Sequence, residues 1–399
     1  MDGSADLQIK LPAASGRMEM YRLQGPRQFV TATSPAQLTR VAYSAGHVVA
    51  DPLAAINPTL DCAVDWDATI AYRQYLWSMG LGVAEAMDTA QRGMGMDWPQ
   101  SLELIRRSTD AAKDIPGALL ASGCGTDQLA PEDARTVDDV IRAYEEQMAA
   151  IEAVGGRLIL MASRALAKVA RSPADYEKVY DRVLRQAKQP VILHWLGDMF
   201  DPALKGYWGS TDTQQAVEIA LGIINAHTSK VDGIKMSLLD KDIEIAVRRR
   251  LPAGVRMYTG DDFNYAELIA GDEIGDTSNR RHSDALLGIF DAIAPAASAA
   301  LLALAQNDRK KFDEILAPTV PLSRHMFGAP TRFYKTGVVF MAWLNGHQSH
   351  FMMVGGQQNA RSLPHLVELF RLADKAGLLL KPELAVVRMR TLLNLHGVA

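Results

Sequence analysis

Short apolar segments alternate with longer segments of helical periodicity through the middle of the chain. Near-continuous apolar runs are typical of strands covered by helices, and their regular alternation with helices predicts a parallel sheet. Eight such repeats favour an α/β fold of the closed (β/α)8 TIM barrel type over an open doubly wound sheet. No Gly-x-Gly-x-x-Gly follows the first strand, which weakens a dinucleotide-binding alternative. The predicted strands are residues 47–51, 82–87, 117–122, 157–161, 190–195, 231–237, 255–259 and 272–277.

The segments on either side of the predicted barrel differ from it in pattern. Residues 1–46 are expected to form an N-terminal extension that contains a short helix and a hairpin of strands at 18–23 and 27–31. The barrel is expected over residues 47–285, and helical periodicity predicts a C-terminal helical region over residues 286–399. Its predicted helices are residues 286–305, 308–327, 332–345, 362–376 and 382–395.

The composition is that of an ordinary globular protein. Of the 399 residues, 48% are hydrophobic and 22% are charged, and the formal net charge is −4. A chain of this charge lacks the basic surface that binds nucleic acid, and no apolar run is long enough to span a membrane. Cys62 and Cys124 are the two cysteines, and their number and spacing are typical of a reducing compartment. We therefore expect a cytoplasmic protein that binds neither nucleic acid nor membranes.

A single lysine stands at the centre of the sixth predicted strand, Val231-Asp-Gly-Ile-Lys-Met-Ser237. Strand alternation puts Gly233, Lys235 and Ser237 on one face. An ammonium group is costly to bury, so a buried amine at this position has a depressed pKa and is a nucleophile. Such an amine forms a Schiff base with a ketone or aldehyde. The alternative is a lysine that extends past the end of the strand into water.

Polar side chains at the ends of other strands are further candidates, because the sites of TIM barrels lie at the carboxyl ends of the strands. His194 ends a strongly apolar strand and can be a general acid or base, or a histidine at the barrel rim whose hydrogen bonds are satisfied. Asp261 and Asp262 can hold substrate hydroxyls or a metal, although one of them can equally cap the helix that follows. Asn279 is also expected at this end of the barrel.

The order of these motifs resembles the dihydrodipicolinate synthase and N-acetylneuraminate lyase family of class I aldolase-like barrels. Val231-Asp-Gly-Ile-Lys-Met-Ser237 matches the Gly-Ile-Lys motif of that family, and Thr259-Gly-Asp-Asp262 matches its Ser-Gly-Asp-Asp turn. Residues 190–195 stand where the family has a Pro-x-x-x-Tyr-Asn strand. The resemblance implies that Lys235 is the Schiff-base lysine, that no cofactor or metal is needed, and that the protein is a homodimer or homotetramer.

Two motifs depart from the family pattern. Met87-Asp-Thr-Ala-Gln91 replaces a Gly-Thr-Thr-Gly-Glu loop that binds the substrate carboxylate, so that Thr89 is kept while Asp88 would repel a carboxylate. After the fourth strand, where the family tyrosine is expected, the chain offers Ser163 or Arg164. We therefore expect a divergent branch with another substrate, such as a polyhydroxy carbonyl compound bound through Asp88, His194 and Asp262.

Three hypotheses follow for the function. The first is a Schiff-base lyase or aldolase that acts on a sugar-derived carbonyl compound or a keto acid. The second is a metal-dependent barrel hydrolase or isomerase with Glu85, His194 and Asp262 as ligands. The third is a non-catalytic barrel. For the first, the expected catalytic residues are Lys235, His194 and Ser163, and the expected substrate-binding residues are Asp88, Thr89, Ser237, Asp261, Asp262 and Asn279.

Overall fold

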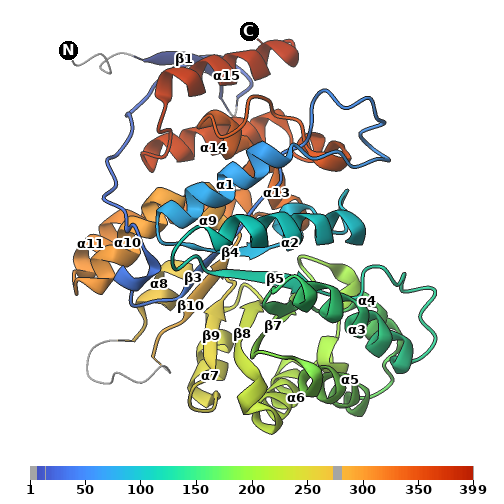
Figure 1. Cartoon of the computed structure of the whole chain (residues 1–399). Helices are drawn as coiled ribbons and strands as arrows, with labels where there is room; N and C mark the ends of the chain where they lie inside the picture. The colour runs from blue at the N-terminus through green and yellow to red at the C-terminus, as the bar shows by residue number, and fades with distance from the viewer. Residues whose placement is uncertain (1–6, 14, 273–280, 399) are drawn as a thin grey trace.

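A closed barrel of eight parallel strands forms the centre of the protein, as the alternation predicts (Figure 1). The computed structural model describes residues 7–13, 15–272 and 281–398. Each strand pairs with the strands before and after it in the chain, and the last pairs with the first. The strands are β3 (Ala42–Ala45), β4 (Gly82–Glu85), β5 (Leu120–Cys124), β6 (Leu158–Leu160), β7 (Val191–Leu196), β8 (Val231–Ser237), β9 (Arg256–Thr259) and β10 (Asp284–Leu287).

The predictions of the first and last strands were wrong. The first strand is β3, and the predicted residues 47–51 form the loop that follows it. The last strand is β10, which pairs with both β9 and β3, whereas residues 273–277 of the predicted strand lie outside the described residues. Both true strands are short. In addition, β10 runs directly into an apolar helical segment, so no change of period marks its end.

Helices surround the barrel, and several of them begin at a side chain that caps the free N–H groups of the first turn. Asp65, Asp97 and Thr136 each accept a hydrogen bond from a backbone N–H in the first turn of the helix that follows. A short additional helix, α4 (Arg164–Val169), follows β6 at the carboxyl end of the barrel. The other barrel helices are α1 (Trp66–Ser78), α2 (Trp98–Lys113), α3 (Val137–Ala153), α5 (Pro173–Gln186), α6 (Thr213–Ala226), α7 (Lys241–Arg250) and α8 (Tyr265–Ala270).

One strand of the N-terminal hairpin lies where it was predicted, at residues 18–22, but its partner precedes it in the chain instead of following it. The hairpin pairs β1 (Gln8–Pro12) with β2 (Met18–Arg22) in antiparallel register, and residues 27–31 are not a strand. The predicted short helix is the 3-10 turn η1 (Pro35–Gln37). The hairpin packs against the last two helices of the chain at the top of Figure 1. The carboxylate of Asp374 accepts hydrogen bonds from the Tyr21 hydroxyl and the Gln24 N–H, which fixes the hairpin to them.

The C-terminal region is helical, as expected, and it packs on the barrel through one shared apolar core. None of the helices in the described part of the chain is long and apolar enough to cross a membrane. The C-terminal helices are α9 (Ile289–Ala292), α10 (Ala294–Ala305), α11 (Arg309–Leu316), α12 (Thr319–Met326), α13 (Tyr334–Leu344), α14 (Leu363–Lys375) and α15 (Pro382–Leu395).

Candidate functional site in the barrel

Lys235 lies on the inner face of β8 and is 5% exposed. Glycine is required at two positions near Lys235 for a steric reason. A Cβ atom on Gly233 would lie 2.6 Å from the ring of Tyr258, which fills the lumen below, and a Cβ on Gly260 would lie 2.8 Å from Cε of Lys235. Both distances are shorter than a real Cβ contact. Gly233 therefore leaves the space that the Tyr258 ring occupies, and Gly260 leaves space for the side chains of Lys235 and Ser237.

The charge state of Lys235 depends on two carboxyl groups. Burial lowers the pKa of the amine, while Asp88 and Asp262 act in the opposite direction. Asp262 is 4% exposed and accepts a hydrogen bond of 2.9 Å from the Ile289 N–H. Burial raises the pKa of Asp262 to about 8. Burial thus acts on both groups toward a neutral amine beside a protonated carboxyl group, which is the form that a nucleophilic lysine requires.

His194 stands beside Lys235 in the register of the neighbouring strand β7. Its Nε2 atom lies 3.3 Å from the Ser237 hydroxyl, and its buried Nδ1 atom has no hydrogen-bond partner among the described residues. Burial and the nearby Lys235 hold the pKa of His194 well below its usual value, so the ring is neutral at pH 7. A neutral imidazole with one unused nitrogen can accept or deliver a proton.

The C-terminal region contributes a tyrosine and a second lysine that the sequence interpretation did not include in the site. The Tyr334 hydroxyl donates to Asp88 over 2.8 Å and lies 2.6 Å from the Thr89 hydroxyl. Nζ of Lys335 lies 4.0 Å from Asp88 and 3.1 Å from the sulfur of Met94. The sequence carried one sign of their involvement. Both stand at the start of α13, a helix whose residues are all buried, and a lysine is rarely buried in such a helix unless its charge has a partner.

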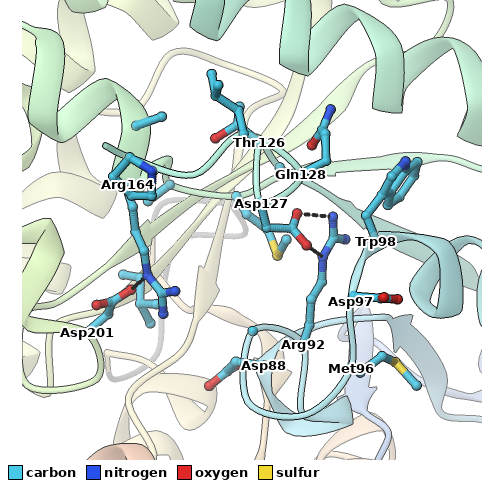
Figure 2. Close-up of a pocket in the computed structure, with 18 of the residues that line it drawn as sticks. Asp88, Arg92, Met96, Asp97, Trp98, Thr126, Asp127, Gln128, Arg164 and Asp201 are labelled. Atoms are coloured by element: carbon cyan, nitrogen blue, oxygen red, sulfur yellow. Dashed lines mark hydrogen bonds and ion pairs between the residues drawn. The ribbon is translucent and has the colours of Figure 1, made fainter. Parts of the chain in front are cut away.

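A cavity of about 480 Å³ opens at the carboxyl end of the barrel. Its wall includes Asp88, which is labelled in Figure 2, and His194. Figure 2 shows two ion pairs at this cavity, Arg92 with Asp127 and Arg164 with Asp201. Apolar and polar side chains from the βα loops complete the wall; they include Leu60, Met96, Trp98, Thr126, Gln128 and Leu129. The cavity is thus large and mixed in character. Lys235 is not part of its wall, and the cavity reaches the surroundings of the lysine through Asp88 and His194.

The other predicted site residues have separate roles in the structure. The Ser163 hydroxyl caps α4 through the Leu166 N–H and lies 2.5 Å from that of Thr126, and it is not part of the cavity wall. Asp261 accepts hydrogen bonds from the backbone of Phe263 and from Asn264, as a capping residue does. Asn279 lies outside the described residues.

The metal-ligand set proposed from the sequence was wrong in its geometry. Glu85 is on the opposite face of its strand from the lumen, where it accepts two hydrogen bonds of 2.9 Å from Arg73 of α1 and one from Ser108 of α2. It therefore cannot meet His194 and Asp262. Among the residues that the structure describes, no three His, Cys, Asp or Glu side chains are placed to hold a metal ion.

The barrel is similar to solved structures at low sequence identity. Dihydrodipicolinate synthase from Aquifex aeolicus has a TM-score of 0.63 at 12% identity, over 86% of this chain and 99% of that chain. A prophage protein of the dihydrodipicolinic acid synthase family from E. coli K12, in complex with pyruvate, has a TM-score of 0.63 at 13% identity, over 86% and 99%. A putative dihydrodipicolinate synthetase from Pseudomonas aeruginosa gives 0.61 at 15%, over 84% and 99%. The resemblance read from the motifs is thereby confirmed at the level of the fold.

One family model matches nearly the whole sequence. It is described as a protein of unknown function (DUF993), and it matches residues 9–398. No curated protein gives a significant match.

Proposed function

We propose that this chain, which belongs to the DUF993 family of proteins of unknown function, is a class I lyase of the aldolase type. Its substrate is a ketone or aldehyde, either a sugar-derived compound or a keto acid, and Lys235 is the nucleophile. The observation that carries the proposal is a lysine inside a barrel, with a lowered pKa, beside a cavity large enough for a small organic substrate. The similarity in fold to dihydrodipicolinate synthases supports it.

The neighbouring groups supply the proton transfers that Schiff-base chemistry requires. The neutral amine of Lys235 attacks the carbonyl carbon, and the resulting carbinolamine loses its oxygen as water. Asp262, whose pKa is raised to about 8, holds a proton that it can give to the departing hydroxyl. The iminium ion then accepts the electron pair of the adjacent C–C bond as that bond breaks, and His194 takes the proton released from the other fragment.

Ser163 has no part in this sequence of steps, because its hydroxyl is engaged with Thr126 and with the first turn of α4. Thr89 acts through Tyr334, to which it is hydrogen-bonded, rather than directly. Asp88 and the Ser237 hydroxyl remain as substrate-binding groups. The expected homodimer or homotetramer is not needed for any of these steps, since all the groups come from one chain.

Reduction with borohydride tests the proposal. The protein is incubated with pyruvate, 2-oxobutyrate, hydroxyacetone, dihydroxyacetone or glyceraldehyde, then reduced and weighed by mass spectrometry. At least one compound should add its mass, less one oxygen, to the wild-type chain and not to Lys235→Ala. Equal labelling of Lys235→Ala by every compound that labels the wild type, or no labelling by any, would contradict the proposal.

A further inference from the structure

The hydroxyl groups near Lys235 are already engaged with protein atoms. The Tyr334 hydroxyl is hydrogen-bonded to Asp88 and to the Thr89 hydroxyl, and the Ser237 hydroxyl lies 3.3 Å from His194. A substrate carboxylate needs two or more hydrogen-bond donors, preferably backbone N–H groups, hydroxyls or a guanidinium fork. The side-chain hydroxyls around the lysine do not offer that set.

Asp88 offers a free acceptor near Lys235. Among the described residues, one carboxylate oxygen of Asp88 has no hydrogen-bond partner, since Tyr334 occupies the other. Asp262 also has one carboxyl oxygen without a partner, and that oxygen accepts once the group has given up its proton. Nδ1 of His194 is also buried and without a partner. Unsatisfied acceptors of this kind are stabilised by a ligand that brings donors, and O–H groups are the donors that a neutral carbonyl compound carries.

Farther from the lysine, the wall of the cavity is also rich in acceptors. It contains four carboxylates, Asp88, Asp97, Asp127 and Asp201, against two guanidinium groups. Both guanidinium groups are held by carboxylates, Arg92 by Asp127 and Arg164 by Asp201. Lys335 offsets part of the charge of Asp88 from 4.0 Å, but it is not part of the cavity wall. An anionic substrate would therefore enter a cavity whose unpaired charges are negative.

The Arg164–Asp201 pair can also bind a hydroxylated ligand. Only Nε of Arg164 is hydrogen-bonded among the described residues, so its two terminal nitrogens can donate to a ligand oxygen. A guanidinium group beside a carboxylate presents donors and an acceptor side by side, and adjacent hydroxyls of a polyol satisfy both. The cavity, at about 480 Å³, has room for a ligand much larger than a three-carbon ketone.

We infer that the substrate is an uncharged, polyhydroxylated ketone or aldehyde, and that Asp88 excludes α-keto acids by placing a carboxylate where theirs would lie. This inference rests on the proposed function, since it assumes that the carbonyl carbon reacts with Lys235. It chooses between the two substrate classes that the proposed function leaves open. Asp88 is thus a specificity-determining residue, which Tyr334 and Lys335 hold in place.

Hydroxyacetone and pyruvate are a matched pair for the test, because they differ only in a hydroxymethyl group against a carboxylate. The rate of borohydride-trapped adduct formation at Lys235 is measured for each compound, and the rate with hydroxyacetone is divided by the rate with pyruvate. This ratio is then divided by the ratio of the two rates measured with Nα-acetyl-lysine, which corrects for the intrinsic reactivity of the two compounds. We expect the corrected ratio to favour hydroxyacetone by about tenfold or more, the effect of roughly 1.4 kcal/mol of charge repulsion. In Asp88→Asn the corrected ratio should move toward pyruvate by a similar factor.

Asp110→Asn is the control, because it removes the same charge from the surface of α2. It should leave the corrected ratio unchanged. A corrected ratio that equals one or favours pyruvate in the wild type, or an equal shift in both variants, overturns the inference while Schiff-base formation stands. Absence of any adduct with both compounds would instead count against the proposed function itself, and the inference falls with it.

Discussion

Two buried lysines, one in the barrel and one in the C-terminal region, interact with the same carboxylate, that of Asp88. Lys235 is 5% exposed and Lys335 is 2% exposed, and burial lowers the pKa of both while Asp88 raises both. Burial and a depressed pKa therefore do not by themselves distinguish a nucleophile from a structural lysine. The distinction has to come from what surrounds each amine.

The surroundings of the two amines differ in chemistry. Lys235 lies beside His194, a cavity-wall residue, and interacts with Asp262, so it has two proton-transfer groups as neighbours. Lys335 contacts the sulfur of Met94 and lies 5.3 Å from the ring centre of Tyr334, neither of which transfers a proton in this setting. We therefore propose that Lys235 carries the chemistry and that Lys335 balances the charge of Asp88.

Replacing each lysine by methionine is the strongest way to break this comparison. Methionine keeps much of the buried volume and removes the amine. Lys235→Met should form no trapped adduct with hydroxyacetone. Lys335→Met should still form it, at a rate lowered by about tenfold or less, because only a partner of Asp88 is lost. Intact-mass measurement of both variants checks this, and adduct loss in Lys335→Met alone would reverse the assignment.

Tyr334→Phe should have the next largest effect. It removes the hydroxyl that donates to Asp88, and a hydrogen bond to a charged group contributes about 1.5–3 kcal/mol. The adduct rate should fall by about tenfold or more, and the preference for hydroxyacetone over pyruvate should fall with it. Tyr265→Phe is the matched control, because its buried hydroxyl bonds Thr319 outside the cavity. An unchanged preference in Tyr334→Phe would show that the hydroxyl does not position Asp88.

The pH dependence of adduct formation tests whether the amine of Lys235 is the group that reacts. Only the unprotonated amine attacks, so the rate should rise with pH and level off above the pKa of Lys235, below the usual value of 10.5. Asp262 raises that pKa, so Asp262→Asn should move the plateau to lower pH. Stopped borohydride reactions over a pH series measure this. A plateau that moves to higher pH in Asp262→Asn would contradict the charge coupling.

Glu244 tests whether a buried carboxyl group with a raised pKa affects stability without affecting the chemistry. Burial raises its pKa to about 8, as for Asp262, but Glu244 is not part of the cavity wall. The folded protein binds a proton at Glu244 that the unfolded chain has lost above its usual pKa of 4.5. The free energy of unfolding should therefore fall as pH rises from that value to about 8, by up to about 1.4 kcal/mol per pH unit. Glu244→Gln should reduce that slope and leave the adduct rate unchanged. Urea denaturation over this pH range measures the slope, and an equal slope in the variant would be the contrary result.

The barrel could be predicted from the sequence because its strands are apolar runs between amphipathic helices. The two strands that were missed, β3 and β10, are four residues each, and their neighbours are as apolar as they are. The burial of Lys235 could be predicted because a lysine at the centre of an apolar strand has little access to water, and its role as a site residue stays a prediction. The metal-ligand set failed at Glu85, because the inner or outer face of a short strand depends on a register that the sequence does not mark.

Tyr334 and Lys335 could not be placed in the site from the sequence, because 246 residues separate Tyr334 from Asp88 and a helical period does not say which barrel end a helix covers. The residues of the cavity wall could not be predicted from the sequence for the same reason. The ion pairs Arg92–Asp127 and Arg164–Asp201 join loops that are distant in sequence, so the excess of carboxylates becomes visible only in the folded chain.

Peptide mapping of the reduced adduct tests the central claim most directly. The wild-type protein is trapped with hydroxyacetone, digested, and each lysine is examined for the added mass. The account predicts that the modification lies on Lys235, with Lys335 unmodified in the same digest. A modification on Lys335, or one spread evenly over surface lysines, would contradict it.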